Sequence, residues 1–286
     1  MSESTKIFAS ETPRLLGLAY RITGSRHDAD DVVQEAWIRF QRETRELRSP
    51  EAWLTTVVSR LAIDRARVLR RDRQRYVGPW LPEPASLDLS PEELAEKADS
   101  LTLAFLIVLD RLSPAARTAF ILVDVFGESY ESVASCLGRS EASCRQLVHR
   151  ARVIVRASEV SSLRPIDQGL LDRLVVALLS GDDDQLLALL SPDVVLTSDG
   201  GPYRRAARRP VLGRDRVARF LTNLTRREPS AAAIVGTVNF GACLYVISTK
   251  GPLLVTGSVR GSMIAHVNLI LNPDKLNGAD ESLLIS

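Results

Sequence analysis

The chain has 286 residues, of which 45% are hydrophobic and 25% are charged, and its formal net charge is +2. This length allows two or three compact units, and the composition excludes a disordered or fibrous chain. Because the chain as a whole is nearly neutral, any surface that binds nucleic acid must be local. We expect a cytoplasmic protein, since the N-terminus lacks the layout of a signal peptide and no apolar run is long enough to span a bilayer.

The first part of the chain, residues 1–77, is expected to be all helical. Apolar residues recur at helical spacing through residues 15–22. A second helix is expected over residues 27–42, with aspartates in its first turn, where the helix dipole favours negative charge. A third helix begins at Ser49 and Pro50, a capping residue followed by a proline, and it becomes strongly basic towards its end.

Residues 78–100 predict an extended linker, because they are rich in proline and show no sustained periodicity. Helices are expected to return from about residue 92 and to continue to residue 158. Near its start the linker contains a WLPEP segment, Trp80 to Pro84, which holds two of the linker's prolines. The linker therefore separates two helical modules.

Residues 130–152 have the layout of a helix-turn-helix. Ala134 is small where two helices cross, Gly138 tolerates positive φ in the turn, and Ser140 can cap the second helix. The side chains expected to face inward are Val133, Leu137, Cys144 and Leu147. An ordinary helical hairpin with a solvated basic face would account for part of this pattern. The agreement of all these features in one register favours DNA recognition.

The last part, residues 164–286, is expected to be a separate α+β domain. Two helices flank a GDDD turn, and a strand then runs into SDGG at residues 198–201. A further helix is expected over residues 213–224, followed by four β-rich runs from residue 233. We interpret the three cysteines, Cys136, Cys144 and Cys243, as structural thiols, and we see no metal-ligand spacing.

Three sequence blocks together resemble the extracytoplasmic-function (ECF) sigma factors of bacterial RNA polymerase, in the sigma-70 family. They are DADDVVQEAW at residues 28–37, PEAWLTTVVSRLAIDRAR at residues 50–67, and the segment from Leu109 to Arg152. WLPEP, SDGG and NPDKL (residues 272–276) resemble one subgroup, in which a SnoaL-like domain follows the sigma modules. The chain departs from that subgroup in one loop, where Pro202 and Tyr203 replace a glycine and a lysine.

The resemblance implies a multidomain fold: two all-α sigma modules joined by a Pro-rich linker, followed by an α+β SnoaL-like cone domain. The implied domains are sigma region 2 at residues 1–77, the linker at 78–100, sigma region 4 at 101–158 and the SnoaL-like domain at 164–286.

By this resemblance, the acidic helix docks on the clamp helices of the largest subunit of core RNA polymerase. Charge complementarity would speed the encounter, and apolar contacts would hold the complex. A solvated helix face explains the same residues taken alone, and the neighbouring blocks favour docking. The predicted polymerase-binding residues are Asp28, Asp30, Asp31, Val32, Val33, Gln34, Glu35 and Trp37.

The basic third helix, by the same resemblance, binds the −10 promoter element. Clustered arginines displace counterions and hold phosphates whatever the base sequence. Opening the duplex moves a base out of the stack, at a cost of roughly 2–4 kcal/mol that pocket contacts must offset. The predicted −10 residues are Arg60, Asp64, Arg65, Arg67, Arg70 and Arg71.

The second helix of the helix-turn-helix would read the −35 element in the major groove. Arginine and glutamine pair with guanine and adenine edges, and one good bidentate contact gives roughly 1–3 kcal/mol of discrimination. The predicted −35 residues are Ser140, Glu141, Arg145, Gln146, His149, Arg150 and Arg152.

The C-terminal domain is expected to regulate the sigma modules in cis. An enzyme on this fold would need a placed base beside its substrate, and His266 lies in an apolar run that favours a structural role. The predicted interdomain residues are Trp80, Leu81, Pro82, Glu83, Pro84, Asp199, Gly200, Gly201, Asn272, Pro273, Asp274, Lys275 and Leu276.

The expected partners are core RNA polymerase and promoter DNA, with no membrane, no dedicated anti-sigma factor, no cofactor and no metal. The chain is expected to act as a monomer within the holoenzyme. Two alternatives stay open. The first is a one-component helix-turn-helix regulator with a ligand-sensing cone. The second is a SnoaL-like enzyme with a DNA-binding appendage, in which His266 and Asp199 would be catalytic.

Overall fold

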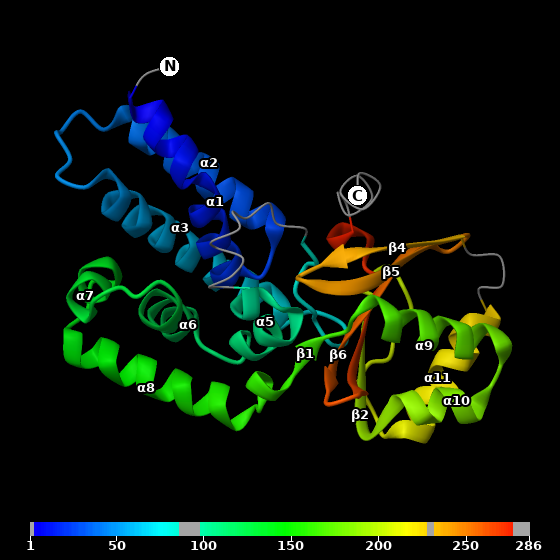
Figure 1. Ribbon diagram of the computed structural model, residues 1–286. Coiled ribbons are helices and arrows are strands. Elements are labelled where there is room, and N and C mark those ends of the chain that lie inside the picture. Colours follow the sequence, from blue (N-terminus) through cyan, green and yellow to red (C-terminus); the bar gives the residue numbers. More distant parts are fainter. Residues whose placement is uncertain (1–2, 86–97, 228–231, 277–286) are drawn as a thin grey trace. The chain divides into compact units, whose positions relative to one another are not determined.

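The computed structural model describes residues 3–85, 98–227 and 232–276 (Figure 1). These residues form two compact units. The first unit holds the chain up to Gln74 and most of the described residues between 98 and Glu159. The second holds residues 75–85, 102–104 and the described residues from Val160 onward. Within the described ranges, no helix is long and apolar enough to cross a membrane.

The first unit begins with three long helices, as predicted. They are α1 (Glu3–Thr23), α2 (Arg26–Arg42) and α3 (Pro50–Arg73). The side chain of Ser25 caps α2 by accepting from the Asp28 amide, and the side chain of Ser49 caps α3 by accepting from the Ala52 amide. The apolar stripes of the three helices pack against one another, with Leu18, Ala36, Leu54 and Val58 fully buried.

The rest of the first unit is also helical. The helix expected from residue 92 is described only from residue 98, because residues 92–97 lie outside the described ranges. The elements are η1 (Ala98–Leu101), α5 (Leu103–Leu109), α6 (Pro114–Phe120), the π-helical turn η2 (Ile121–Val125), α7 (Tyr130–Leu137) and α8 (Glu141–Ala157).

The predicted linker is described in part. Residues 78–85 have neither helix nor strand, as predicted, whereas residues 86–97 of the same prediction lie outside the described residues. Residues 75–85 form part of the second unit, so the described half of the linker belongs to the same compact unit as the C-terminal domain.

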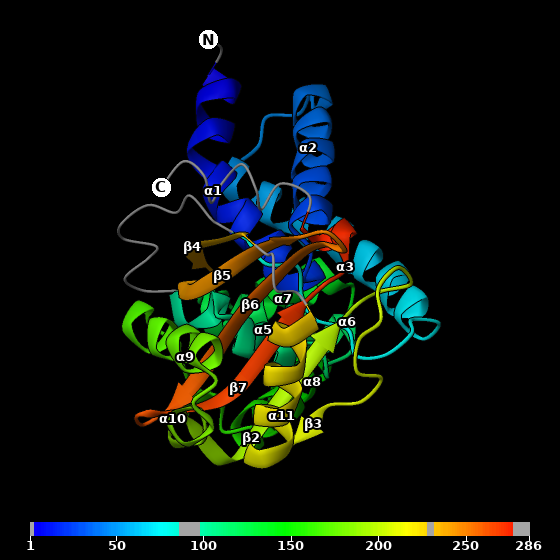
Figure 2. The same cartoon turned by 90° about the vertical axis from the view of Figure 1, so that its right-hand side faces the viewer.

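The second unit is an α+β domain built on a curved mixed sheet (Figure 2). The strand order is β3-β2-β7-β6-β5-β4, with β1 paired to β6, and only the β2–β7 pairing is parallel among the described strands. After η3 (Val160–Ser162), the elements are β1 (Arg164–Pro165), α9 (Gln168–Ser180), α10 (Asp183–Leu189), β2 (Leu190–Asp199), β3 (Val211–Leu212), α11 (Arg214–Arg227), β4 (Ala232–Val238), β5 (Gly241–Ser248), β6 (Gly251–Arg260), β7 (Met263–Ile270) and η4 (Pro273–Lys275).

One face of this sheet carries the core of the second unit. Helices α9, α10 and α11 cover it (Figure 2), and their leucines interdigitate with residues of β2, β5, β6 and β7. This is the helix-on-curved-sheet arrangement expected of a SnoaL-like domain. Strands β2 and β7 end side by side at one edge of the sheet. Asp199 lies there at the end of β2, and the chain continues from β7 into η4.

Candidate functional site

The helix-turn-helix forms as the sequence predicts. Gly138 ends α7 with φ 61°, and its amide donates to the carbonyl of Ala134. The side chain of Ser140 caps α8 by accepting from the amide of Ser143. Val133 and Cys144 are fully buried, as expected.

One part of the inward-facing prediction is wrong in its register. Leu137 and Leu147 are half-buried, and the buried face of α8 is instead made by Cys144, Val148 and Ala151. Steps of four and then three residues follow the helical period, which leaves Leu147 at the edge of the stripe. All three cysteines are free and buried, which agrees with structural thiols.

The outer face of α8 presents the predicted −35 residues. Glu141, Arg145, Gln146, His149 and Arg150 are exposed. Arg145 Nη2 lies 2.7 Å from Glu141 Oε2, and its guanidinium sits over the Tyr130 ring at 4.6 Å. Arg152 differs from them, because its guanidinium is held by both carboxylate oxygens of Asp124 at 2.6–3.1 Å. Arg152 must therefore release a partner before it can hold a phosphate.

The structure divides the eight predicted polymerase-binding residues of α2 between two faces. Asp28, Val32 and Val33 are buried and support the helix from within. Exposed or half-buried positions are held by Asp30, Asp31, Gln34, Glu35 and Trp37. The Trp37 ring packs 4.7 Å from Phe8 and 6.3 Å from Phe40, measured between ring centroids, so this face combines carboxylates with aromatic surface.

Several of the predicted −10 residues on α3 already have partners in the same unit. Arg65 donates to the buried carboxylate of Asp28, and Arg67 pairs with Asp64 at 2.7 Å. Arg60 donates to the carbonyls of Ser135 and Cys136, at 2.8 and 2.9 Å. These bonds attach α3 to the C-terminal end of α7. The remaining two predicted residues donate to carbonyls, Arg70 to Leu112 and Arg71 to Arg67.

The predicted interdomain residues converge on one carboxylate, that of Asp199 at the end of β2. Its side chain is fully buried. Oδ1 accepts from the Tyr76 hydroxyl at 2.5 Å and from the Gly201 amide at 3.1 Å. Oδ2 accepts from the Leu81 amide at 2.8 Å and from Lys275 Nζ at 2.6 Å. We call this cluster the linker site: Tyr76, Trp80, Leu81, Asp199, Asn272 and Lys275.

Lys275 contacts both the Asp199 carboxylate and the aromatic residues of the linker site. Its Nζ also donates to the carbonyl of Leu81 at 2.5 Å and lies 4.1 Å from the centroid of the Trp80 ring. Asn272 Nδ2 donates to the Tyr76 hydroxyl at 2.9 Å. Burial raises the pKa of Tyr76, and the hydrogen bond to Asp199 raises it further, so the phenol stays protonated and donates.

The two glycines of the SDGG motif are required by close packing. A Cβ on Gly200 would lie 2.2 Å from the carbonyl oxygen of Arg204. Gly201 has φ 57°, and a Cβ there would lie 2.8 Å from the Asn272 side chain. Pro202 and Tyr203, the departure from the subgroup pattern, are exposed and leave the environment of Asp199 intact.

The other predicted interdomain residues flank the linker site. Pro82, Pro84 and Leu276 are buried, and Glu83 and Pro273 are half-buried. Asp274 is exposed and contributes its amide, which donates to Asn272 Oδ1 at 3.1 Å.

Sequence reasoning missed Tyr76 and a second attachment of the linker, where Ala85 and Asn239 exchange two hydrogen bonds of 2.9 and 3.1 Å. Tyr76, four residues before Trp80 at the start of the WLPEP segment, was an available signal for the first. Nothing in the sequence marks Asn239 as the partner of residue 85.

Comparison with known proteins identifies the helical modules. Residues 7–72 match the model of sigma-70 region 2, and residues 103–154 match that of sigma-70 region 4. The ECF RNA polymerase sigma factor SigJ of Mycobacterium tuberculosis is 36% identical over 289 residues, which cover 95% of this chain and 93% of SigJ. The chain belongs to the ECF sigma factors of the sigma-70 family.

Two further comparisons cover nearly all of this ECF sigma factor. The probable ECF RNA polymerase sigma factor SigI of M. tuberculosis is 31% identical over 92% of this chain and 91% of its own length. The crystal structure of M. tuberculosis SigJ aligns with a TM-score of 0.78 at 35% identity, over 96% of this chain and 98% of that one. The likeness therefore extends through the C-terminal domain.

The general function follows from membership of this family. Sigma factors bind core RNA polymerase and promoter DNA and direct the start of transcription, and the family is not enzymatic. Both carboxylate oxygens of Asp199, a residue that the enzyme alternative would make catalytic, accept hydrogen bonds from the linker site. Among the described residues, no group of acidic, histidine and cysteine side chains is arranged to hold a metal ion.

Proposed function

We propose that the C-terminal domain controls this sigma factor in cis, by holding the linker at the linker site. The observation that carries the proposal is the buried Asp199 carboxylate, which binds the linker at Leu81, Tyr76 just before the linker, and the domain's own Lys275. The linker joins the two promoter-binding modules, so a domain that holds its first half acts on the path between them.

The strength of the linker site sets how readily the linker is released. Lys275 and Asp199 have side-chain exposures of 10% and 0%, so water screens their attraction poorly. A linker held in this way changes its path only when the pair opens, and a regulator acts by shifting the balance between held and released states.

We also propose roles for the exposed faces of the sigma modules. Asp30, Asp31, Gln34, Glu35 and Trp37 would meet core polymerase, because they form the accessible face of α2. Asp28, Val32 and Val33 would support that face from within.

For the −35 element, we propose that Arg145, Gln146, His149 and Arg150 contact DNA directly. Ser140 would fix the start of α8, and Arg152 would follow once it leaves Asp124. For the −10 element, Arg60 and Arg70 would exchange backbone carbonyls for DNA phosphates. Each exchange replaces one set of charge-assisted hydrogen bonds with another.

Control by a fused domain makes a dedicated anti-sigma partner unnecessary in this proposal. The chain would act as a monomer within the holoenzyme. A tight complex between the sigma modules and a separate anti-sigma protein would contradict this part.

Run-off transcription with purified core polymerase on a promoter library tests the proposal. Lys275→Met in the full chain removes the positive charge that faces Asp199 in the linker site, and Lys250→Met is the matched control on an exposed lysine. We expect promoter-specific transcripts from the wild type and the control, and a several-fold change in yield for Lys275→Met. A chain ending near Ser158, which lacks the C-terminal domain, shows whether that domain activates or inhibits transcription. Equal yields from all four proteins would refute control in cis and leave the sigma role intact.

A further inference from the structure

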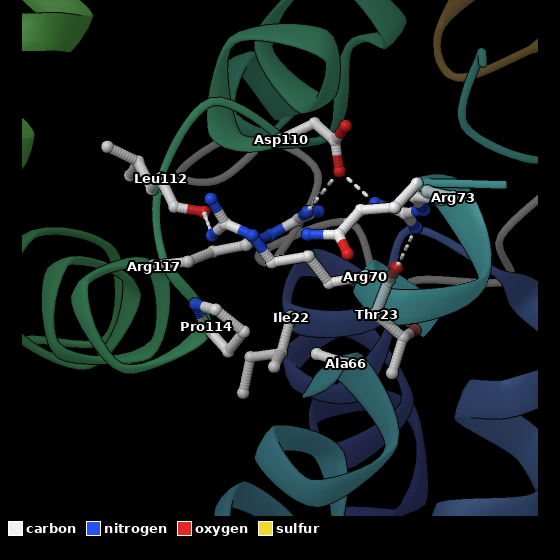
Figure 3. A pocket seen from close by; sticks show the side chains of 10 residues that line it. Ile22, Thr23, Ala66, Arg70, Arg73, Asp110, Leu112, Pro114 and Arg117 are labelled. Carbon is white, nitrogen blue, oxygen red and sulfur yellow. Dashed lines mark hydrogen bonds and ion pairs between the residues drawn. The ribbon is translucent and has the colours of Figure 1, made fainter. Parts of the chain in front are cut away.

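The first unit contains a polar pocket, and none of its lining residues belongs to the linker site. Arg70 and Arg73 of α3 line one wall, Asp110 follows α5, and Arg117 comes from α6 (Figure 3). The pocket has a volume of about 260 Å³. We call it the arginine pocket. Its remaining lining residues are Ile22, Thr23, Ala66, Gln74, Leu112 and Pro114.

The arginine pocket carries more positive charge than its own residues neutralise. Three guanidinium groups line it against the single carboxylate of Asp110. Arg73 donates to that carboxylate, and Arg117 Nη1 lies 3.6 Å from the same oxygen. Figure 3 shows the guanidinium groups gathered beside Asp110. One carboxylate shared by two arginines, with a third close by, leaves an excess of two positive charges.

Arg117 has an unused donor at this position. The residue is 3% exposed, and its Nε donates to the Arg21 carbonyl at 2.6 Å. Its Nη2 is buried and hydrogen-bonds to none of the residues that the structure describes. Burial lowers the pKa of Arg117 to about 10, Asp110 opposes this, and Arg73 lowers it further. A buried cationic donor without an acceptor is costly, and a bound anion would supply the acceptor.

We infer that the arginine pocket binds a phosphate group. Arginine presents planar forks of donors that suit phosphate oxygens, and a phosphate monoester carries a charge of about −1.5 to −2 at neutral pH, which matches the excess. At roughly 30 Å³ for each water-sized group, the pocket holds a phosphoryl group and a small substituent. A lone carboxylate would neutralise only half of the excess charge.

The arginine pocket is lined by residues of both sigma modules. Arg70 lies in the matched region 2, Arg73 directly follows it, and Asp110 and Arg117 lie in the matched region 4, so a phosphate would contact both modules and favour their packed arrangement. The phosphate has two possible sources, a free small phosphate or the DNA backbone, since Arg70 is also a proposed −10 residue.

Calorimetric titration of the full chain tests the inference. Inorganic phosphate and pyrophosphate are added at constant ionic strength, with chloride as the reference anion. Arg70→Gln removes an exposed arginine at the pocket, and Arg111→Gln is the matched control, an exposed arginine one residue from Asp110 that does not line the pocket. We expect saturable binding by the wild type and the control, weakened roughly tenfold or more by Arg70→Gln.

Asp110→Asn should change the affinity for phosphate in the opposite direction to Arg70→Gln. Removing the one competing carboxylate raises the excess charge, so phosphate should bind this variant several-fold more tightly and raise its Tm by more than that of the wild type. A variant that had merely lost structure would bind more weakly.

A short single-stranded DNA titrated into the same proteins distinguishes the two sources. Binding of DNA but not of free phosphates, with the same dependence on Arg70 and the same indifference to Arg111, would assign the phosphate to DNA. Saturable binding of free phosphate would assign a small ligand. If neither ligand binds in an Arg70-dependent manner, or if Asp110→Asn fails to tighten binding, the inference is wrong.

Discussion

Two ion pairs of this sigma factor have similar distances between their charged atoms, but they differ in how far their side chains are exposed to water. Lys275 and Asp199 lie 2.6 Å apart with side-chain exposures of 10% and 0%, and three chain segments meet around them. Arg145 and Glu141 lie 2.7 Å apart with exposures of 58% and 46%, one helical turn apart on α8. The first pair organises the linker site, and the second is a local pair on a surface.

The difference follows from the medium around each pair. Water and salt screen an exposed pair, whose net contribution to stability is about 0–1 kcal/mol, so Arg145 can leave Glu141 for DNA at little cost. Removing one partner of a buried pair leaves an uncompensated charge, which costs about 3–5 kcal/mol. The proposed recognition of the −35 element therefore uses an exposed charge that separates at little cost in free energy, and the proposed control uses a buried pair whose separation costs several kcal/mol.

The largest effect is expected from Asp199→Asn. The neutral amide removes the negative charge that faces Lys275 in a buried site, and we expect the opening free energy of the linker to fall by about 3–5 kcal/mol. Hydrogen exchange of the peptide that carries the Leu81 amide measures this. Asp193→Asn is the control, because its pair with Arg260 is exposed on both sides, at 68% and 41%. Equal exchange protection in both variants would contradict the role of the buried pair.

Gly200→Ala tests the same site by shape and not by charge. Its Cβ would meet a backbone oxygen at 2.2 Å, so the loop that carries Asp199 must shift, at a cost of about 1–3 kcal/mol in the free energy of unfolding. Urea unfolding followed by circular dichroism measures the loss. Gly169→Ala, whose Cβ would meet its nearest neighbour at 3.5 Å in the first turn of α9, should be neutral or slightly stabilising. A loss of the same size in both would argue against packing at Gly200.

Arg145→Ala should leave stability nearly unchanged and damage promoter recognition. The pair with Glu141 contributes only about 0.3–0.5 kcal/mol to folding, whereas a lost base contact costs roughly 1–3 kcal/mol, or about 5- to 150-fold in promoter affinity. Promoter binding by the holoenzyme and the Tm of the variant are measured side by side. Arg156→Ala, an exposed arginine near the end of the same helix, is the control. Unchanged promoter affinity would remove Arg145 from the −35 residues.

The smallest effect is expected from the titration of Tyr76. Burial and Asp199 raise its pKa in the folded protein above the ordinary 10.0, so the folded state keeps the phenolic proton when the unfolded state has lost it. The stability that Tyr76 contributes is fully present below pH 10.0 and falls as the pH rises beyond it. Unfolding free energies at about pH 9 and about pH 11 should differ more for the wild type than for Tyr76→Phe. Identical pH profiles would show that the phenol does not bind Asp199.

The sequence by itself determined the local features of this protein. Ser25, Ser49 and Ser140 cap the helices they precede, and Gly138 adopts the positive φ that ends α7, because each depends on a few neighbouring residues. Helical and strand periodicity likewise predicted the longer helices and strands of both units, whereas the short strands β1 and β3 were not predicted. The sequence blocks predicted the sigma family, and the comparisons confirmed it.

Only the tertiary structure decided which of the predicted side chains are accessible and which residues meet. Periodicity alone could not show that Val148 replaces Leu147 in the core, or that Asp28 is buried beneath Arg65. Tyr76 reaches Asp199, and Arg73 reaches Asp110, across long stretches of sequence. Burial and long-range pairing depend on how whole elements pack, and it is burial that turns an ordinary aspartate or arginine into a site.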